Sequence, residues 1–200
     1  MIAIIDYGMG NLFSVEKAFK KLGADVLVTS DKNIIANAEK AVLPGVGAFG
    51  DCMKNLQEYQ LIDAIKDYAS SGKPLLGICL GLQLMFEQSA ESHGIKGLGI
   101  FKGTVKKINA PALKIPHMGW NDLCLGTSSP LLNGLPQNPY VYFVHSYQAV
   151  PEDEKIITAY CMYGEKVTAA VGRGSVQAVQ FHPEKSSNVG MKILQNFVEL

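Results

Sequence analysis

The chain has 200 residues, of which 48% are hydrophobic and 18% are charged, and its formal net charge at pH 7 is zero. This length and composition suit one globular domain, which we expect to span residues 1–200. The balanced charge argues against electrostatic binding of nucleic acid or of an anionic membrane. No apolar run approaches the ~20 residues that a membrane-spanning helix needs.

The four cysteines are scattered through the chain at Cys52, Cys79, Cys124 and Cys161. No two of them are close enough for a C-x-x-C metal or redox motif. In a chain of this length, scattered cysteines are typical of reduced thiols in a cytosolic protein. The chain opens Met-Ile-Ala-Ile-Ile-Asp, without the basic segment and cleavage site of a signal peptide. We therefore expect a cytoplasmic protein.

Predicted strands and helices alternate in the first half of the chain. Short apolar runs predict strands at 2–5, 25–29, 41–43 and 74–78, and helical spacing predicts helices at 14–22, 61–68 and 80–88. After about residue 98 strand-like runs dominate, at 141–144, 156–160, 167–171 and 176–181, before a closing helix at 189–198. This order predicts an α/β fold with an open, mostly parallel sheet flanked by helices and an added strand-rich, partly antiparallel part.

A nucleophile elbow is predicted at Gly77–Gly81, where the strand at 74–78 meets the next helix. The segment fits the pattern G-x-nucleophile-x-G, with Cys79 as the nucleophile. The turn is so tight that its flanking positions must be glycine, and it places the sulfur at a helix N-terminus, where positive partial charge favours a thiolate. The alternative is a buried structural cysteine, so the interpretation requires a base.

A base and a carboxylate follow the predicted strand at 176–181, in Phe-His-Pro-Glu-Lys. Pro183 ends the strand, so that His182 and Glu184 point to the same side of the sheet end. Glu184 would accept the proton of one ring nitrogen and leave the other facing Cys79. We predict Cys79, His182 and Glu184 as nucleophile, base and orienting carboxylate.

The other three histidines are weaker candidates for the base. His117 and His145 have no carboxylate two residues away, and we interpret both as wall or interface residues. His93 lies in a polar stretch, where we expect it to be solvated.

The glycine-rich segment Pro44–Gly50 follows the predicted strand at 41–43. In an acyl-transfer enzyme, the backbone N–H groups of Val46 and Gly47 would form an oxyanion site together with that of Leu80. A phosphate loop is disfavoured, because the segment has neither a G-K-[ST] motif nor G-x-G-x-x-G spacing after the first strand. A plain glycine-rich turn is the remaining alternative.

Taken together, these motifs resemble the class I glutamine amidotransferase family, in order from Met1 to Leu200. The segments Pro-Gly-Val-Gly at 44–47 and Met-Gly-Trp-Asn at 118–121 are most similar to the glutaminase subunits of imidazole glycerol phosphate synthases. The resemblance implies a flavodoxin-like fold and hydrolysis of glutamine through a Cys79 thioester, with no metal or organic cofactor. His182 would protonate the departing ammonia and then activate the hydrolytic water.

The resemblance also implies substrate and partner contacts. The residues that would hold glutamine are Gly47, Gln83, Glu91, Ser146 and Tyr147. Because the chain is too short for a second catalytic domain, the ammonia would pass to a (βα)8-barrel cyclase subunit, in a heterodimer that serves histidine biosynthesis. The residues that would face this partner are Asn11, Trp120, Tyr142 and Lys185.

Three alternatives remain open at this point. The ammonia could serve anthranilate or pyridoxal phosphate synthesis, against which the segments at 44–47 and 118–121 argue. A non-catalytic binding module on the same fold is disfavoured by the intact set of Cys79, His182 and Glu184. A Cys-His peptidase is disfavoured by Gln83 and Glu91, through the resemblance alone.

Overall fold

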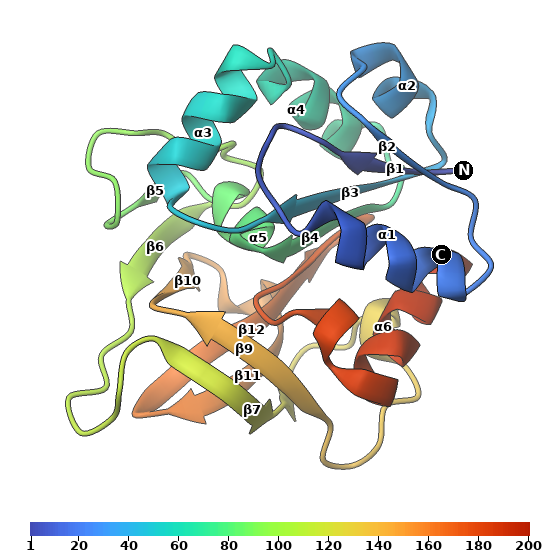
Figure 1. The fold of residues 1–200 in the computed structure, drawn as a ribbon. Helices are drawn as coiled ribbons and strands as arrows, with labels where there is room; N and C mark the ends of the chain where they lie inside the picture. The colour runs from blue at the N-terminus through green and yellow to red at the C-terminus, as the bar shows by residue number, and fades with distance from the viewer.

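An eight-stranded sheet forms the centre of the computed structural model, which describes residues 1–200 (Figure 1). Its strands lie in the order β2 (Val26–Thr29), β1 (Ile2–Ile5), β3 (Lys40–Gly45), β4 (Leu75–Cys79), β13 (Val176–Val179), β12 (Glu165–Arg173), β11 (Ile157–Tyr163) and β8 (Cys124–Leu125). Neighbours from β2 to β13 are parallel, and those from β13 to β8 are antiparallel. The order 2-1-3-4 is flavodoxin-like, and the predicted fold class is confirmed.

Helices cover both faces of the parallel strands (Figure 1). They are α1 (Leu12–Lys21), α2 (Lys32–Asn37), α3 (Phe49–Glu58), α4 (Ile62–Ser70), α5 (Leu80–Leu84) and α6 (Ser187–Glu199). Successive side chains of a strand point to opposite faces, so β1 contributes to two cores. Ile2 and Ile4 pack in one core with side chains of α1 and α6. Ala3 and Ile5 pack in the other with side chains of α2, α3, α4 and α5.

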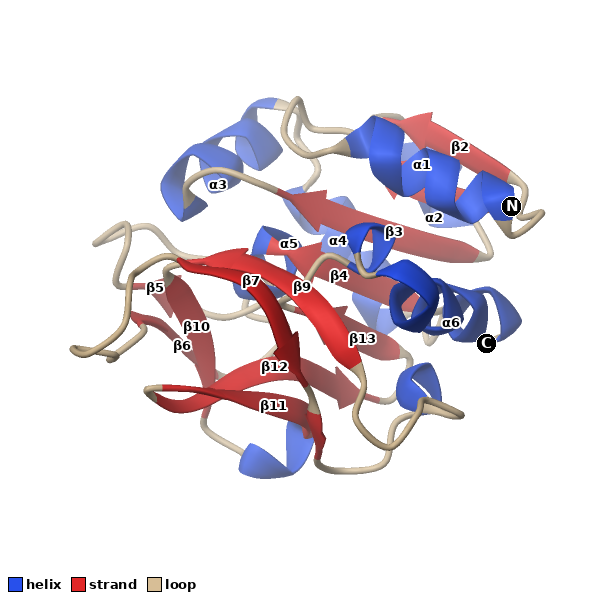
Figure 2. Cartoon of the chain, turned by 60° about the horizontal axis from the view of Figure 1, so that its bottom comes forward, coloured by secondary structure: helices blue, strands red, loops and turns tan.

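Two smaller sheets lie beside the antiparallel part (Figure 2). One has the order β10 (Tyr147–Pro151), β6 (Gly103–Lys107) and β5 (Gln88–Ser89), and the other pairs β7 (His117–Asp122) with β9 (Tyr140–His145). Short 3-10 helices occur at Pro130–Leu132, Glu154–Ile156 and Pro183–Lys185. Because one sheet runs unbroken from β2 to β8, we propose that residues 1–200 form a single domain.

The structure differs from the prediction at several element ends. Pro44 and Gly45 do not end the third strand, because they pair with Ile78 and Cys79 of β4. The predicted helix at 80–88 stops at Leu84. Helices α2 and α3 were not predicted, nor were the individual strands β5 to β8 and β10. None of the helices combines the length and apolar character needed to cross a membrane.

Candidate active site

Cys79 lies on a strained turn between β4 and α5. Its backbone has φ 56° and ψ −112°, a conformation that side-chain-bearing residues rarely adopt. A Cβ atom on Gly81 would collide with the carbonyl oxygen of Leu43, and one on Gly77 would lie 3.0 Å from the Met85 side chain. The sharp elbow expected from the glycine spacing is therefore present.

Three adjacent parallel strands bring the predicted motifs to one edge of the sheet. Cys79 ends β4, the loop with Val46 and Gly47 follows β3, and His182 lies just beyond β13. Ligands of open α/β sheets bind beyond the carboxyl ends of such strands. The predicted residues that line a pocket of about 310 Å³ there are Val46, Gly47, Cys79, Leu80, Gln83, Glu91, Ser146, Tyr147 and His182. Pro116, Val144 and His145 complete its wall.

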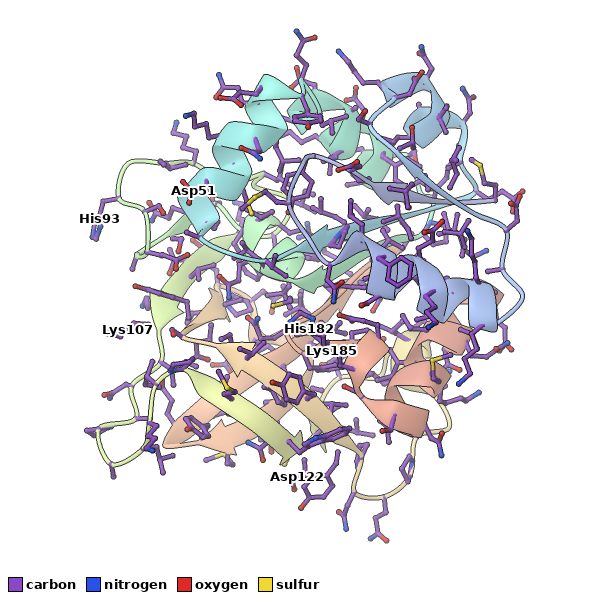
Figure 3. The ribbon with its side chains drawn as sticks, viewed as in Figure 1. Asp51, His93, Lys107, Asp122, His182 and Lys185 are labelled. Atoms are coloured by element: carbon purple, nitrogen blue, oxygen red, sulfur yellow. The ribbon has the colours of Figure 1, made fainter.

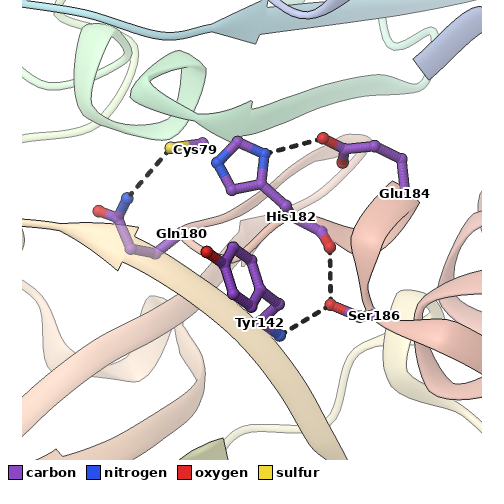
Figure 4. Close-up of polar contacts among 6 residues, drawn as sticks. All are labelled: Cys79, Tyr142, Gln180, His182, Glu184 and Ser186. Atoms are coloured by element: carbon purple, nitrogen blue, oxygen red, sulfur yellow. Dashed lines mark hydrogen bonds and ion pairs between the residues drawn. The ribbon is translucent and has the colours of Figure 1, made fainter. Parts of the chain in front are cut away.

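His182 and Glu184 form a buried pair behind the cysteine (Figure 4). The Nδ1 atom of His182 lies 2.8 Å from Oε1 of Glu184, and the two side chains are only 3% and 1% exposed. An ionised carboxylate only accepts hydrogen bonds, so Nδ1 carries the proton. Figure 4 shows the other ring nitrogen directed toward Cys79, and Nε2 is buried without a hydrogen-bond partner.

The charge of His182 is set by its two neighbours. Burial lowers the pKa of this imidazole, but its interactions with Cys79 and Glu184 favour the protonated ring and raise the pKa to about 10. The raised pKa favours an imidazolium next to the cysteine sulfur. Such a group is suited to donate a proton to a leaving group.

Ser186 fixes the backbone of the segment that carries the base (Figure 4). Its hydroxyl donates to the carbonyl of His182 at 2.6 Å and accepts from the N–H of Tyr142 at 2.9 Å. The N–H of His182 in turn donates to the carbonyl of Tyr142 at 3.0 Å. The sequence analysis missed Ser186, because its role depends on β9, which is distant in the chain.

Gln180 is a second neighbour of the cysteine that the sequence analysis missed. This fully buried side chain points its Nε2 toward the sulfur of Cys79 at 3.9 Å. Its Oε1 accepts a hydrogen bond from Nε2 of Gln83 at 3.0 Å. The sequence feature that could have indicated Gln180 is an amide residue within the apolar run at 176–181. A polar side chain that is buried in a strand requires hydrogen-bond partners, and these can belong to a site.

The end of β3 packs tightly against the elbow. A Cβ on Gly45 would lie 2.8 Å from the backbone nitrogen of Gly81. The hydroxyl of Tyr7 donates to the carbonyl of Pro44 at 2.8 Å, and the thiol of Cys52 donates to that of Val46 at 3.4 Å. Side chains below the strand thus hold the backbone of the predicted oxyanion segment.

Glu91 connects the pocket wall to helix α3. Its Oε2 accepts a hydrogen bond from the N–H of Phe49 at 2.8 Å, in the first turn of α3. A carboxylate is favourable at a helix N-terminus, so this contact alone explains part of its placement. Its predicted contact with glutamine remains a prediction.

The remaining cysteines differ from Cys79 in their surroundings. Burial raises the pKa of the Cys52 thiol to about 11 and that of the Cys161 thiol to about 12. Cys124 is half-buried on β8. Among the cysteines, only Cys79 lines the pocket.

The three other histidines occupy two kinds of environment. His117 and His145 are buried, with Nδ1 of His117 3.0 Å from Nε2 of His145. His145 lines the pocket, in agreement with its interpretation as a wall residue. His93 is exposed and lies on a loop away from His182 (Figure 3).

The predicted partner contacts lie on elements that touch one another. Trp120 of β7 is 52% exposed and packs edge-on against Tyr142 of β9, with ring centroids 6.2 Å apart. The 3-10 helix that carries the exposed Lys185 contacts both β9 and α1, and Asn11 directly precedes α1. A docking role for this face remains a proposal.

A family model described as glutamine amidotransferase class-I matches residues 3–200. The chain belongs to the class I glutamine amidotransferase family. Its relatives include the imidazole glycerol phosphate synthase subunit HisH of Syntrophotalea carbinolica, which is 48% identical over the full length of both chains. The protein of the same name from Aquifex aeolicus is 50% identical over 97% of this chain and 94% of its own length.

Solved structures share the fold at much lower sequence identity. A crystal structure of a glutamine amidotransferase superposes with a TM-score of 0.77 at 19% identity and covers both chains completely. The structure of PurLQS from Thermotoga maritima gives a TM-score of 0.76 at 20% identity over 99% of this chain and 97% of that one. At these identities the likeness concerns the fold alone.

Proposed function

We propose that this chain is the glutaminase subunit of an imidazole glycerol phosphate synthase. The observation that carries the proposal is the similarity to subunits of that name, which are 48% and 50% identical to this chain over all or nearly all of its length. The pocket at the sheet edge supports it, because a strained cysteine faces a buried His–Glu pair there. The catalytic assignment of Cys79, His182 and Glu184 is part of the proposal.

The first half-reaction forms a thioester. The Cys79 thiolate attacks the side-chain carboxamide carbon of glutamine, and the carbonyl oxygen becomes an oxyanion. Val46, Gly47 and Leu80 line the pocket, and their backbone N–H groups are the proposed donors. As the tetrahedral intermediate collapses, the C–N bond breaks and the His182 imidazolium gives its proton to the leaving nitrogen, which departs as ammonia.

The second half-reaction restores the enzyme. Neutral His182 removes a proton from a water molecule, and the resulting hydroxide attacks the thioester carbonyl carbon. The C–S bond breaks, releasing glutamate and returning the Cys79 thiolate beside the imidazolium. Glu184 keeps the proton on Nδ1 through both steps, so that Nε2 alone exchanges protons with the reactants.

The ammonia is proposed to be used by a second subunit. The relatives are named as subunits of a synthase, so a partner protein follows from the proposal. We propose a (βα)8-barrel cyclase as that partner, in a cytoplasmic heterodimer that docks over Asn11, Trp120, Tyr142 and Lys185. The exposed tryptophan–tyrosine pair supports this face, because aromatic residues are common anchors of interfaces.

Pairing the chain with candidate synthase subunits tests the proposed function. The purified chain is mixed separately with the cyclase subunit and with the synthase subunits for anthranilate and pyridoxal phosphate, and product formation from glutamine is measured. We expect glutamine-dependent product only with the cyclase subunit. Product with another subunit would favour another ammonia-using synthase, and no glutamine hydrolysis with any of them would favour a non-catalytic module.

Replacing Trp120 with alanine is expected to weaken binding of the cyclase subunit by about 2 kcal/mol, roughly thirtyfold in Kd. The reason is that a half-exposed indole would lose most of its contact with water on docking. Titration calorimetry measures the effect. Leu27→Ala on the edge strand β2, where the side chain is 41% exposed, is the matched control. Equal affinities for the two variants would place the docking face elsewhere.

A further inference from the structure

A chain of hydrogen bonds runs from β7 to the pocket wall. Nδ2 of Asn121 lies 3.3 Å from Nε2 of His117, whose Nδ1 lies 3.0 Å from Nε2 of His145. Nδ1 of His145 lies 2.8 Å from the carbonyl oxygen of Tyr147. The four residues come from β7, β9 and β10, and both histidines are buried.

The carbonyl at the end of this chain determines the direction of every bond in it. A carbonyl oxygen only accepts, so Nδ1 of His145 carries the proton and its Nε2 accepts. Nδ1 of His117 must therefore donate, and its Nε2 accepts from the Asn121 amide. That amide also donates to the carbonyl of Met162 at 3.1 Å. Each ring is thus a neutral Nδ1–H tautomer, and burial supports this by lowering the pKa of both histidines to about 4.

The Tyr147 carbonyl also fixes the amide of Gln83. Nε2 of Gln83 donates to this carbonyl at 3.1 Å and to Oε1 of Gln180 at 3.0 Å. Both amide hydrogens are then used, so Oε1 is the polar atom of Gln83 that remains for a ligand. In a pocket that takes an amino acid, an amide oxygen is suited to accept a hydrogen bond from the α-ammonium group.

Ring stacking keeps the first histidine in place. The imidazole of His117 stacks between two aromatic rings, with centroid distances of 4.6 Å to Phe143 and 4.0 Å to Tyr163. Its rotation would break the stacking and leave Nε2 of His145 buried without a donor. A buried acceptor without a partner is costly, so the packing favours one arrangement of the whole chain.

We propose that His117 and His145 are positioning residues for the substrate: as a neutral pair they hold the Tyr147 carbonyl, and through it Gln83, in the pose that receives the α-ammonium group of glutamine. The proposal rests on the glutaminase function proposed above. Neither histidine exchanges a proton with the reacting amide, and their effect falls on substrate binding rather than on the chemical step.

Steady-state kinetics of the complete complex separate these roles. His145→Leu removes the donor to the Tyr147 carbonyl and is expected to raise the KM for glutamine about tenfold, while kcat stays within about threefold. His145→Asn places an amide donor near the former Nδ1 and is expected to recover most of the loss. Exposed His93→Ala is the control and should match the wild type. An unchanged KM in His145→Leu, or a loss confined to kcat, would overturn the proposal.

Nuclear magnetic resonance tests the tautomers independently of activity. The chain is labelled with ¹⁵N in its histidine rings and bound to the unlabelled synthase subunit at pH 7. We expect the spectra to show both His117 and His145 as neutral Nδ1–H tautomers. The substitution His117→Phe is expected to alter the signals of His145. This variant also serves for the kinetic measurements should His145→Leu not fold. An Nε2–H tautomer or an imidazolium at either position would overturn the chain of bonds. A wild-type complex without glutaminase activity would refute the proposed function while leaving this measurement decisive for the hydrogen bonds.

Discussion

Replacing Cys79 with alanine is expected to lower glutamine-dependent synthesis by on the order of five decades, while the same complex still makes product from added ammonia. The thioester cannot form without the sulfur, and no other cysteine lines the pocket. The ammonia-using step of the proposed partner should be unaffected, because Cys79 is assigned to the glutaminase reaction alone. Product formation is measured with glutamine and with ammonium salt in parallel.

Cys124→Ala is the matched control for this substitution. Cys124 is half-buried on β8 and lies outside the pocket, so both activities should match the wild type. Substantial glutamine-dependent turnover in Cys79→Ala would mean that the elbow cysteine is structural. A parallel loss of the ammonia-dependent reaction would indicate damage to the complex rather than to catalysis.

Replacing His182 with alanine is expected to lower the glutaminase kcat by roughly three decades or more. The raised pKa of His182 favours an imidazolium beside the sulfur, which is the proposed proton donor to the departing ammonia. Alanine removes this donor. Glutamate release by the complex under saturating glutamine is the measurement, because it reports the chemical step rather than substrate binding.

The other histidines provide internal comparisons for this variant. His93→Ala should leave kcat unchanged, because the side chain is exposed on a distant loop. His145→Leu is expected to act on KM, as argued from the contact of His145 with Tyr147. Near-normal turnover in His182→Ala, or a larger loss of kcat in His145→Leu than in His182→Ala, would make the assignment of the base wrong.

The parts of the site that are local in sequence could be predicted. The elbow depends on two glycines two residues either side of Cys79, and the His182–Glu184 pair depends on a two-residue spacing across Pro183. In both cases the geometry follows from a few consecutive backbone angles. The alternation of strands and helices predicted the parallel sheet in the same way.

The parts that depend on distant segments could not be predicted. Ser186 acts by joining the His182 segment to β9, and Gln180 acts by accepting from Gln83. The His117–His145 contact requires the register of β7 against β9, and β7 has no clean alternation of apolar and polar residues. Helix α3 has its first-turn N–H groups satisfied by Glu91 and Ser92, which lie far along the chain, so no local capping signal marked its start.

Direct detection of the thioester tests the central claim most sharply. The complex is mixed with glutamine and the nucleotide substrate of the cyclase, quenched in acid during turnover, digested, and analysed by mass spectrometry. The account predicts a γ-glutamyl group on the peptide that contains Cys79, absent in Cys79→Ala and in samples without glutamine. A glutamyl group on a peptide with Cys52, Cys124 or Cys161, or glutamate release at full rate with no adduct at any cysteine, would contradict it.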